Sequence, residues 1–179
     1  MSENTPSRLW VMRTAFVALV VAILFFHLLP LQTATGGLIW PDLVLTFAMA
    51  WSVRRPEYVP PVLLAGVFLM ADLLLQRPPG LWAALALIAC EQVKAQSRSL
   101  RDATLVAEMM SVAAWIVGVG VAYQVVQAIL LVQAPPLGLA AVQIVVTLLT
   151  YPLVVAVTHA LMGVRKAAPN DMGGKGVRS

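Results

Sequence analysis

Six apolar segments, separated by short polar or proline-containing breaks, follow one another along the chain. A helix needs about 20 mainly apolar residues to cross the hydrocarbon core of a bilayer, and the longest segments exceed this length. The pattern predicts an all-α integral membrane protein, a bundle of six transmembrane helices in a single membrane domain. The predicted spans are residues 9–31, 38–53, 58–75, 81–93, 103–133 and 137–164.

The breaks contain residues that end helices. Arg54, Arg55, Pro56 and Glu57 form a tight polar turn after the second segment, because proline disfavours helical conformation in the residue before it. Residues 94–102 are rich in polar side chains, and they predict a polar hinge after the fourth span.

The second segment is the weakest candidate for a full crossing. A helix over residues 38–53 would be only about 24 Å long, whereas the hydrocarbon core is about 30 Å thick. The segment therefore either crosses with local thinning of the bilayer or enters and leaves on one side.

The composition excludes an ordinary soluble protein. The chain has 179 residues, of which 60% are hydrophobic and 11% charged, and its mean hydropathy is +0.87. A soluble domain carries about 25% charged residues. The single cysteine, Cys90, also excludes an intramolecular disulfide and a thiolate metal cluster.

The basic residues indicate how the chain is oriented. Lys and Arg concentrate in the cytoplasmic loops of membrane proteins. With six full spans and a cytoplasmic N-terminus, all of the 12 basic residues except Arg77 fall on the cytoplasmic side, which favours a full crossing by the second segment. We expect residues 1–8 and a disordered basic tail, 165–179, to lie in the cytoplasm. The formal charge of +4 then reflects orientation and not binding to nucleic acid.

Four acidic residues within or beside the spans are candidates for function, because a charge in hydrocarbon is costly. Glu91 precedes Lys94 by three residues, a spacing that allows an ion pair on one helix. Glu108 lies early in the fifth span, where the helix dipole favours an acid. For both residues a structural role is the favoured interpretation.

The other two acids, Asp42 and Asp72, lie toward the outer face in this topology. Asp42 follows Pro41 at the start of a span and is well placed to cap the helix. Asp72 is near the end of its helix, where an acid opposes the dipole, so it needs a donor or a cation. We predict a contact between Asp72 and Arg77, with Asp42 as a third member of a polar cluster that fixes helix packing or receives a partner.

Polar residues recur at helical spacing on the last two spans. The fifth span contains Gln124 and Gln127, and the sixth contains Gln143, Thr147, Thr150, Tyr151 and Thr158. Hydrogen bonds between helices are the favoured explanation, and a surface that lines a solute path is the alternative. The sequence has no nucleotide-binding, hydrolase or zinc motif, so we expect no enzymatic activity, metal or cofactor.

Small and aromatic residues suggest two further features. Gly118 and Gly120 predict a close approach of helices. Aromatic residues at the span ends suggest an interfacial belt: Trp10, Trp40, Trp51, Tyr58 and Trp82.

A set of short motifs follows in order between residues 41 and 82. They are Pro41-Asp42-Leu43 with Trp51, Arg54-Arg55-Pro56-Glu57, Gly66, Ala71-Asp72-Leu73-Leu74 and Arg77-Pro78-Pro79-Gly80-Leu81. Their order and spacing resemble those of the rod shape-determining membrane protein family MreD in its alphaproteobacterial form. The rest of the chain is similar to that family in length and number of spans.

This resemblance implies a non-enzymatic scaffold of cell-wall elongation in the bacterial inner membrane. Such a protein would bind MreC, a bitopic periplasmic protein, and through it couple to the actin-like MreB filament, the glycosyltransferase RodA and a class B penicillin-binding transpeptidase. Arg54, Arg55 and Glu57 would contact a cytoskeletal protein or anionic lipid head groups from a cytoplasmic loop, and lipid is the favoured partner.

The alternative function is that of a substrate-binding (S) subunit of an energy-coupling-factor (ECF) vitamin transporter, because the helical arrangement of the MreD family is thought to resemble these subunits. A vitamin-binding subunit should have an outward-facing pocket with several polar and aromatic groups. The outer loops of this chain offer only Gln32, Thr33, Thr35 and Arg77. An ion or lipid transporter is less favoured, because two aspartates at one membrane face do not form a relay across it.

Overall fold

The structure, a computed structural model, describes residues 6–29, 40–101, 104–131 and 136–162, and all of its regular elements in these ranges are helices. The predicted tail 165–179, the N-terminal residues 1–5 and the outer-loop residues 30–39 lie outside the described residues. The elements are α1 (Pro6–Leu28), α2 (Leu43–Arg54), the short 3-10 helix η1 (Pro56–Tyr58), α3 (Pro61–Leu74), α4 (Leu81–Arg101), α5 (Leu105–Ile129) and α6 (Leu137–Met162).

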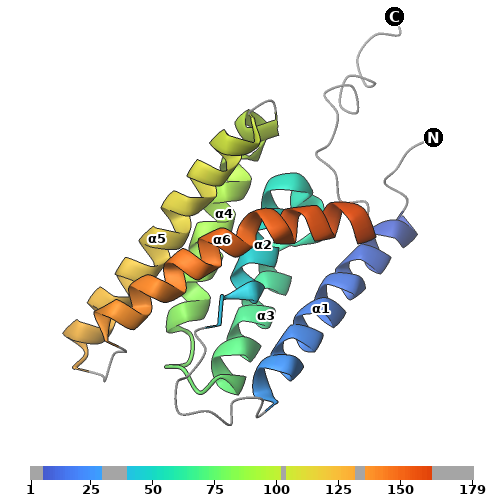
Figure 1. Cartoon of the computed structure of the whole chain (residues 1–179). Coiled ribbons are helices and arrows are strands. Elements are labelled where there is room, and N and C mark those ends of the chain that lie inside the picture. The colour runs from blue at the N-terminus through green and yellow to red at the C-terminus, as the bar shows by residue number, and fades with distance from the viewer. Residues whose placement is uncertain (1–5, 30–39, 102–103, 132–135, 163–179) are drawn as a thin grey trace, which may run out of the picture.

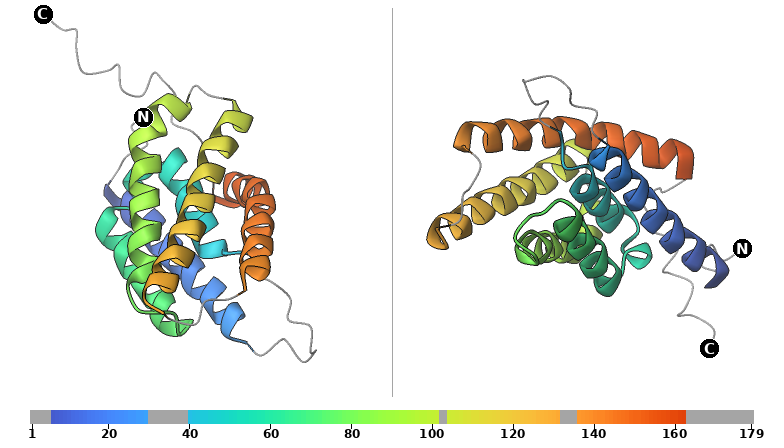
Figure 2. Two further views of the ribbon diagram at one scale, coloured as in Figure 1. Left: turned by 90° about the vertical axis from the view of Figure 1, so that its left-hand side faces the viewer. Right: turned by 90° about the horizontal axis from the view of Figure 1, so that it is seen from below.

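The helices run in alternating directions around a central α2 (Figure 1). Helix α2 packs against both α4 and α6, and its residues from Val44 to Arg54 are all buried. Seen from below, α2 lies between α6 on one side and α3 with α4 on the other (Figure 2). The starts of α2, α4 and α6 and the ends of α1, α3 and α5 therefore meet at one end of the bundle.

Local sequence explains where α2 and α3 begin and end. Asp42 caps α2, because its Oδ1 accepts a hydrogen bond from the Leu45 backbone N–H at 3.0 Å. Pro60 precedes α3 and Pro61 is its first residue, where a missing N–H is tolerated. Beyond α3, Gln76 has a φ of 54° and Gly80 a φ of 86°, and these left-handed residues turn the chain into α4.

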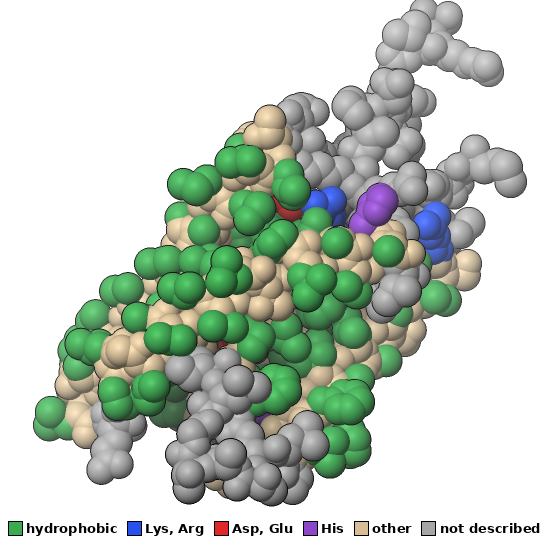
Figure 3. All heavy atoms as spheres, in the orientation of Figure 1, with side chains coloured by type: hydrophobic (Ala, Val, Ile, Leu, Met, Phe, Trp, Pro, Cys, Tyr) green, Lys and Arg blue, Asp and Glu red, His purple; other side chains and the backbone are tan. Residues whose placement is uncertain are grey.

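Three helices are long and apolar enough to cross a membrane: residues Ser7–Leu28, Leu105–Ile129 and Leu137–Ala160. Hydrophobic side chains also cover most of the described surface on the face drawn in Figure 3, and the visible Lys and Arg side chains lie near one end. Such a surface is unsuited to water. The chain is a membrane protein whose described part contains six α-helices.

Two expectations about the helices were wrong. The polar hinge predicted over 94–102 is helical as far as the structure describes it, since α4 continues to Arg101 and residue 102 lies outside the described residues. This stretch contains no Gly or Pro, and its Ala, Leu, Gln, Lys and Arg residues favour helix even though most of them are not apolar. Helices α2 and α3 are also shorter than the predicted spans, with 12 and 14 residues.

The predicted aromatic belt is wrong for two of its five residues. Trp10 is 66% exposed, whereas the side chains of Trp51 and Tyr58 are buried. Trp51 occupies the core between α1 and η1, with its ring centroid 5.2 Å from that of Phe16 and 6.2 Å from that of Tyr58. A large aromatic side chain in this position fills the space around α2.

Candidate functional site

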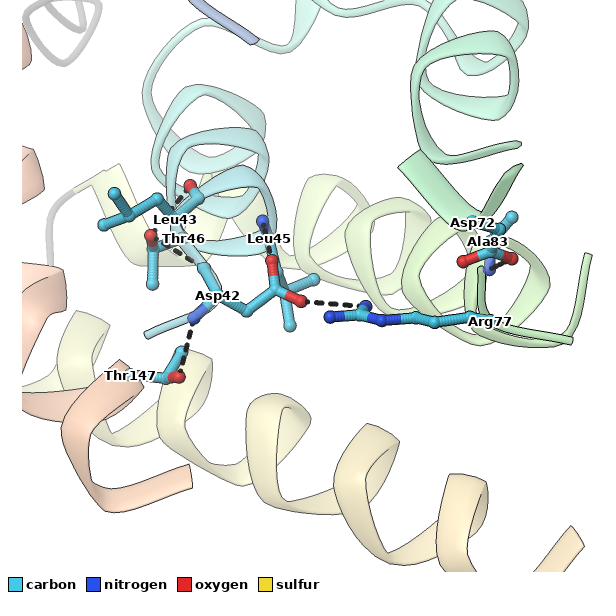
Figure 4. Close-up of polar contacts among 8 residues, drawn as sticks. All are labelled: Asp42, Leu43, Leu45, Thr46, Asp72, Arg77, Ala83 and Thr147. Atoms are coloured by element: carbon cyan, nitrogen blue, oxygen red, sulfur yellow. Dashed lines mark hydrogen bonds and ion pairs between the residues drawn. The ribbon is translucent and has the colours of Figure 1, made fainter. Parts of the chain in front are cut away.

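An ion pair joins the start of α2 to the connection between α3 and α4. Arg77 Nη1 lies 3.3 Å from Asp42 Oδ2, and the exposed fractions of the two side chains are 21% and 9%. The backbone N–H of Asp42 donates to Thr147 Oγ1 of α6 at 3.0 Å. Asp42 therefore holds three parts of the chain together while it caps α2 (Figure 4).

Asp72 has different partners from those predicted. Its side chain is fully buried, and Oδ2 accepts hydrogen bonds from the backbone N–H groups of Gly80 and Ala83, both at 3.0 Å. It thus caps the N-terminus of α4, where free N–H groups favour an anion. The predicted side-chain contact with Arg77 was wrong, because Arg77 extends toward Asp42 (Figure 4). Only the backbone N–H of Arg77 bonds to the Asp72 carbonyl, at 3.0 Å.

A cavity of about 510 Å³ lies beside the Asp42–Arg77 pair, between the start of α2, the start of α4, α5 and α6. Its polar lining consists of Asp42, Gln76, Arg77, Tyr123, Gln124, Gln127, Gln143 and Thr147. Its apolar lining consists of Leu45, Pro78, Trp82, Ile116, Gly120, Ala140 and Ile144. This volume is in the range of small-molecule binding sites, which also combine apolar walls with a few polar groups.

A smaller cavity of about 240 Å³ lies near the end of α1. Residues Asp42, Arg77 and Gln143 line both cavities. The ion pair is therefore part of a wall between the two.

Two aromatic side chains of the larger cavity contact each other. The rings of Trp82 and Tyr123 meet edge to face, with centroids 5.1 Å apart and an interplanar angle of 87°. The guanidinium carbon of Arg77 lies 5.0 Å from the centroid of the Trp82 ring, a distance typical of a cation–π contact. Arg77 is thus held by a carboxylate and an aromatic ring together.

The polar residues that recur at helical spacing on the last two predicted spans have two roles in the structure. Gln143 and Thr147 line the cavity, as do Gln124 and Gln127 on α5. The hydroxyls of Thr150 and Thr158 instead donate to carbonyls of their own helix.

Gly120 permits the close approach of α5 and α6 that was expected of the glycine pair. A Cβ built on Gly120 would lie 2.6 Å from Ile144 Cδ1, whereas one on Gly118 would meet nothing within 4 Å. Of the two glycines, only Gly120 therefore has a neighbour that a larger side chain would have to displace.

A second buried cluster joins α2, α5 and α6. Arg54 Nη2 lies 3.2 Å from Glu108 Oε1, and the Tyr151 hydroxyl donates to the same oxygen at 3.0 Å. The Glu108 side chain is fully buried and that of Arg54 is 9% exposed. Sequence reasoning placed Glu108 at a helix start, which is correct, but it did not identify either partner.

The remaining predicted polar residues lie at the same end as this cluster. The expected pair of Glu91 and Lys94 is confirmed, at 2.6 Å. Arg55 Nη1 lies 3.5 Å from Glu57 Oε1, and Arg13 donates to the Glu57 carbonyl at 3.2 Å. The side chains of Arg54 and Arg55 are mostly buried, so they face protein groups more than a surface partner.

No group of three His, Cys, Asp or Glu residues in the described part of the chain is placed to hold a metal ion. Comparisons with known proteins add no function, because no family model, curated protein or solved structure matches the chain.

Proposed function

We propose that the protein is a non-enzymatic scaffold of the cell-wall elongation machinery in a bacterial inner membrane, and that it binds MreC. The observation that carries this proposal is the role of the residues on which the resemblance to the MreD family rests. Asp42 and Arg77 form an ion pair, and the Asp72 side chain caps the start of α4. The backbone of Asp42 also links the start of α2 to α6. Such residues stabilise a fold, and a scaffold depends on its fold.

In this proposal the chain crosses the membrane six times, with both termini in the cytoplasm. The alternating helix directions and the sorting of charges support this topology (Figure 1). Arg54, Lys94 and Glu108 lie toward one end of the bundle, while Arg77 lies at the other with Asp42 and Asp72. The basic end is the cytoplasmic one.

The short helices are compatible with this topology. Helix α2 has only 12 residues, but α4 and α6 enclose it. Irregular backbone is tolerated at membrane depth where protein surrounds it. Pro41 and Arg55, which flank α2, therefore do not need to be helical for the segment to cross.

Copurification tests the scaffold proposal. The full chain and a tagged MreC from the same organism are coexpressed and purified together in mild detergent. We expect a stable complex that contains both proteins. A Val62→Leu variant is a suitable control, because Val62 is 84% exposed and its replacement leaves the internal contacts intact. A folded, monodisperse chain that never retains MreC would overturn the proposal.

The second candidate function is that of a substrate-binding subunit of an ECF-type transporter, and the larger cavity favours it. The outer loops offer few polar groups for a vitamin, but helix residues such as Tyr123, Gln127 and Gln143 line the cavity. Tight binding of a vitamin, together with copurification of a transporter scaffold in place of MreC, would support this function over the first.

A further inference from the structure

We propose that the larger cavity binds a small, uncharged molecule with a planar ring that carries an amide or lactam group. This inference does not depend on the scaffold function, because such a ligand could occupy a scaffold or a transport subunit. It rests on one buried hydrogen-bond acceptor, on the charge balance of the lining and on the aromatic wall.

The buried acceptor is the side-chain oxygen of Gln127. The residue is only 3% exposed and lines the cavity, and its Oε1 has no hydrogen-bond partner in the described part of the chain. A buried polar group without a partner is costly. A rotation of the Gln127 side chain would turn this oxygen toward the cavity, where a donor on a bound molecule would satisfy it, which predicts an N–H or O–H group on the ligand.

The charges of the lining cancel. Asp42 and Arg77 are the two charged residues among those that line the cavity, and they pair with each other at 3.3 Å. Asp42 also accepts from Leu45, and Arg77 lies over Trp82. Both charges are therefore already compensated, and an ionised ligand would enter without a counter-ion. An uncharged ligand suits this lining.

The glutamine side chains of the lining favour amide chemistry. Gln127 and Gln143 come from α5 and α6, and each can both donate and accept a hydrogen bond. An amide or lactam edge also presents a donor beside an acceptor. The edge-to-face pair of Trp82 and Tyr123 provides an aromatic surface, and a flat ring packs well against aromatic side chains.

The cavity also lies where a ligand would contact several helices at once. It is bounded by the start of α2, the start of α4, α5 and α6. Gly120 allows Ile144 to approach α5 closely at the cavity wall. A bound molecule would thus stabilise the folded arrangement of these helices, and thermal unfolding can detect it.

The test uses the full purified chain in detergent with three defined probes: hypoxanthine, nicotinamide and lumichrome, each planar and uncharged at neutral pH. We expect at least one to raise the Tm by about 5–10 °C at a concentration about 100-fold above its Kd. The planar anion 2-naphthoate should produce no shift.

Two variants and a matched control locate the binding. Gln127→Met should abolish the shift while leaving the ligand-free Tm equal or higher, because it removes a buried acceptor that lacks a partner among the described residues. Ala140→Phe should also abolish it by filling the cavity. Gln92→Met makes the same substitution at an exposed residue of α4 outside the cavity and should retain the full shift.

Four outcomes would overturn the inference. The first three are that none of the probes shifts the Tm, that the shift persists in both cavity variants, and that 2-naphthoate binds equally well. The fourth is a copurified phospholipid whose amount falls in Ala140→Phe, since a lipid would then be the occupant. MreC copurification is measured separately, so these outcomes leave the scaffold proposal standing.

Discussion

The buried pair of Arg54 and Glu108 allows a quantitative test of the fold. Glu108 is fully buried, and its carboxylate contacts both Arg54 at 3.2 Å and Tyr151 at 3.0 Å. Removing one partner of a buried ion pair costs about 3–5 kcal/mol, because the other charge is left uncompensated. We therefore expect Glu108→Met to lower the free energy of unfolding by about 3–5 kcal/mol.

A double-mutant cycle separates the ion pair from the hydrogen bond. Arg54→Met alone should also cost about 3–5 kcal/mol, but the double variant should be more stable than either single one, because two apolar side chains replace the two charges. Tyr151→Phe should cost less, about 1.5–3 kcal/mol, because it removes one hydrogen bond to an ionised carboxylate but leaves the ion pair in place.

The assay is SDS-induced unfolding in mixed micelles, followed by the helical circular dichroism signal. A Glu108→Met variant within about 0.6 kcal/mol of the wild type would refute the reasoning, since the pair would then be no stronger than an ordinary interhelical hydrogen bond. Strict additivity of the two single variants would refute it as well, because residues in contact should be coupled.

Three further predictions concern other parts of the molecule. Asp72→Asn should lower the free energy of unfolding by about 1–3 kcal/mol, because the new amide donor is buried without an acceptor, and it should weaken MreC copurification; an unchanged yield of complex would contradict this role. In the same unfolding assay, Gly118→Ala should raise stability by up to about 1 kcal/mol through helix propensity, whereas Gly120→Ala should be less stable than Gly118→Ala because of its steric contact across the helix crossing. With Cys90 replaced by Ser, a cysteine at the exposed Pro79 should react with a membrane-impermeant maleimide from outside intact spheroplasts; labelling only after lysis would contradict the proposed topology.

Local sequence signals predicted the local features of the fold. The helix start at Asp42 and the pair of Glu91 and Lys94 depend on residues three positions apart, and helical spacing alone is enough to expect them. Asp72 shows the limit of the same approach. The sequence showed that it needs donors, but backbone N–H groups just before and within the first turn of the next helix, eight and eleven residues later, supply them. Almost every residue has a backbone N–H group, so the sequence does not show which of these groups will donate to Asp72.

Contacts between distant segments could be predicted only in part. Arg54 and Glu108 are 54 residues apart, and no periodicity joins them. The proposed topology does place both at the cytoplasmic end of their spans, which is a signal that could have suggested the pair. The polar residues at helical spacing on the last two helices suggested a solute-lining surface, but the larger cavity also needs residues from the starts of α2 and α4, which no periodicity connects to them.

The bond between the Asp42 backbone and Thr147 has a consequence for biogenesis. These residues are 105 positions apart, and a ribosome that adds about 5–20 residues per second needs roughly 5–20 s to make the chain between them. During this interval the start of α2 has been synthesised while its partner on α6 has not. The start of α2 therefore lacks this acceptor until the last helix has been made, and the contact between α2 and α6 belongs to the late steps of folding.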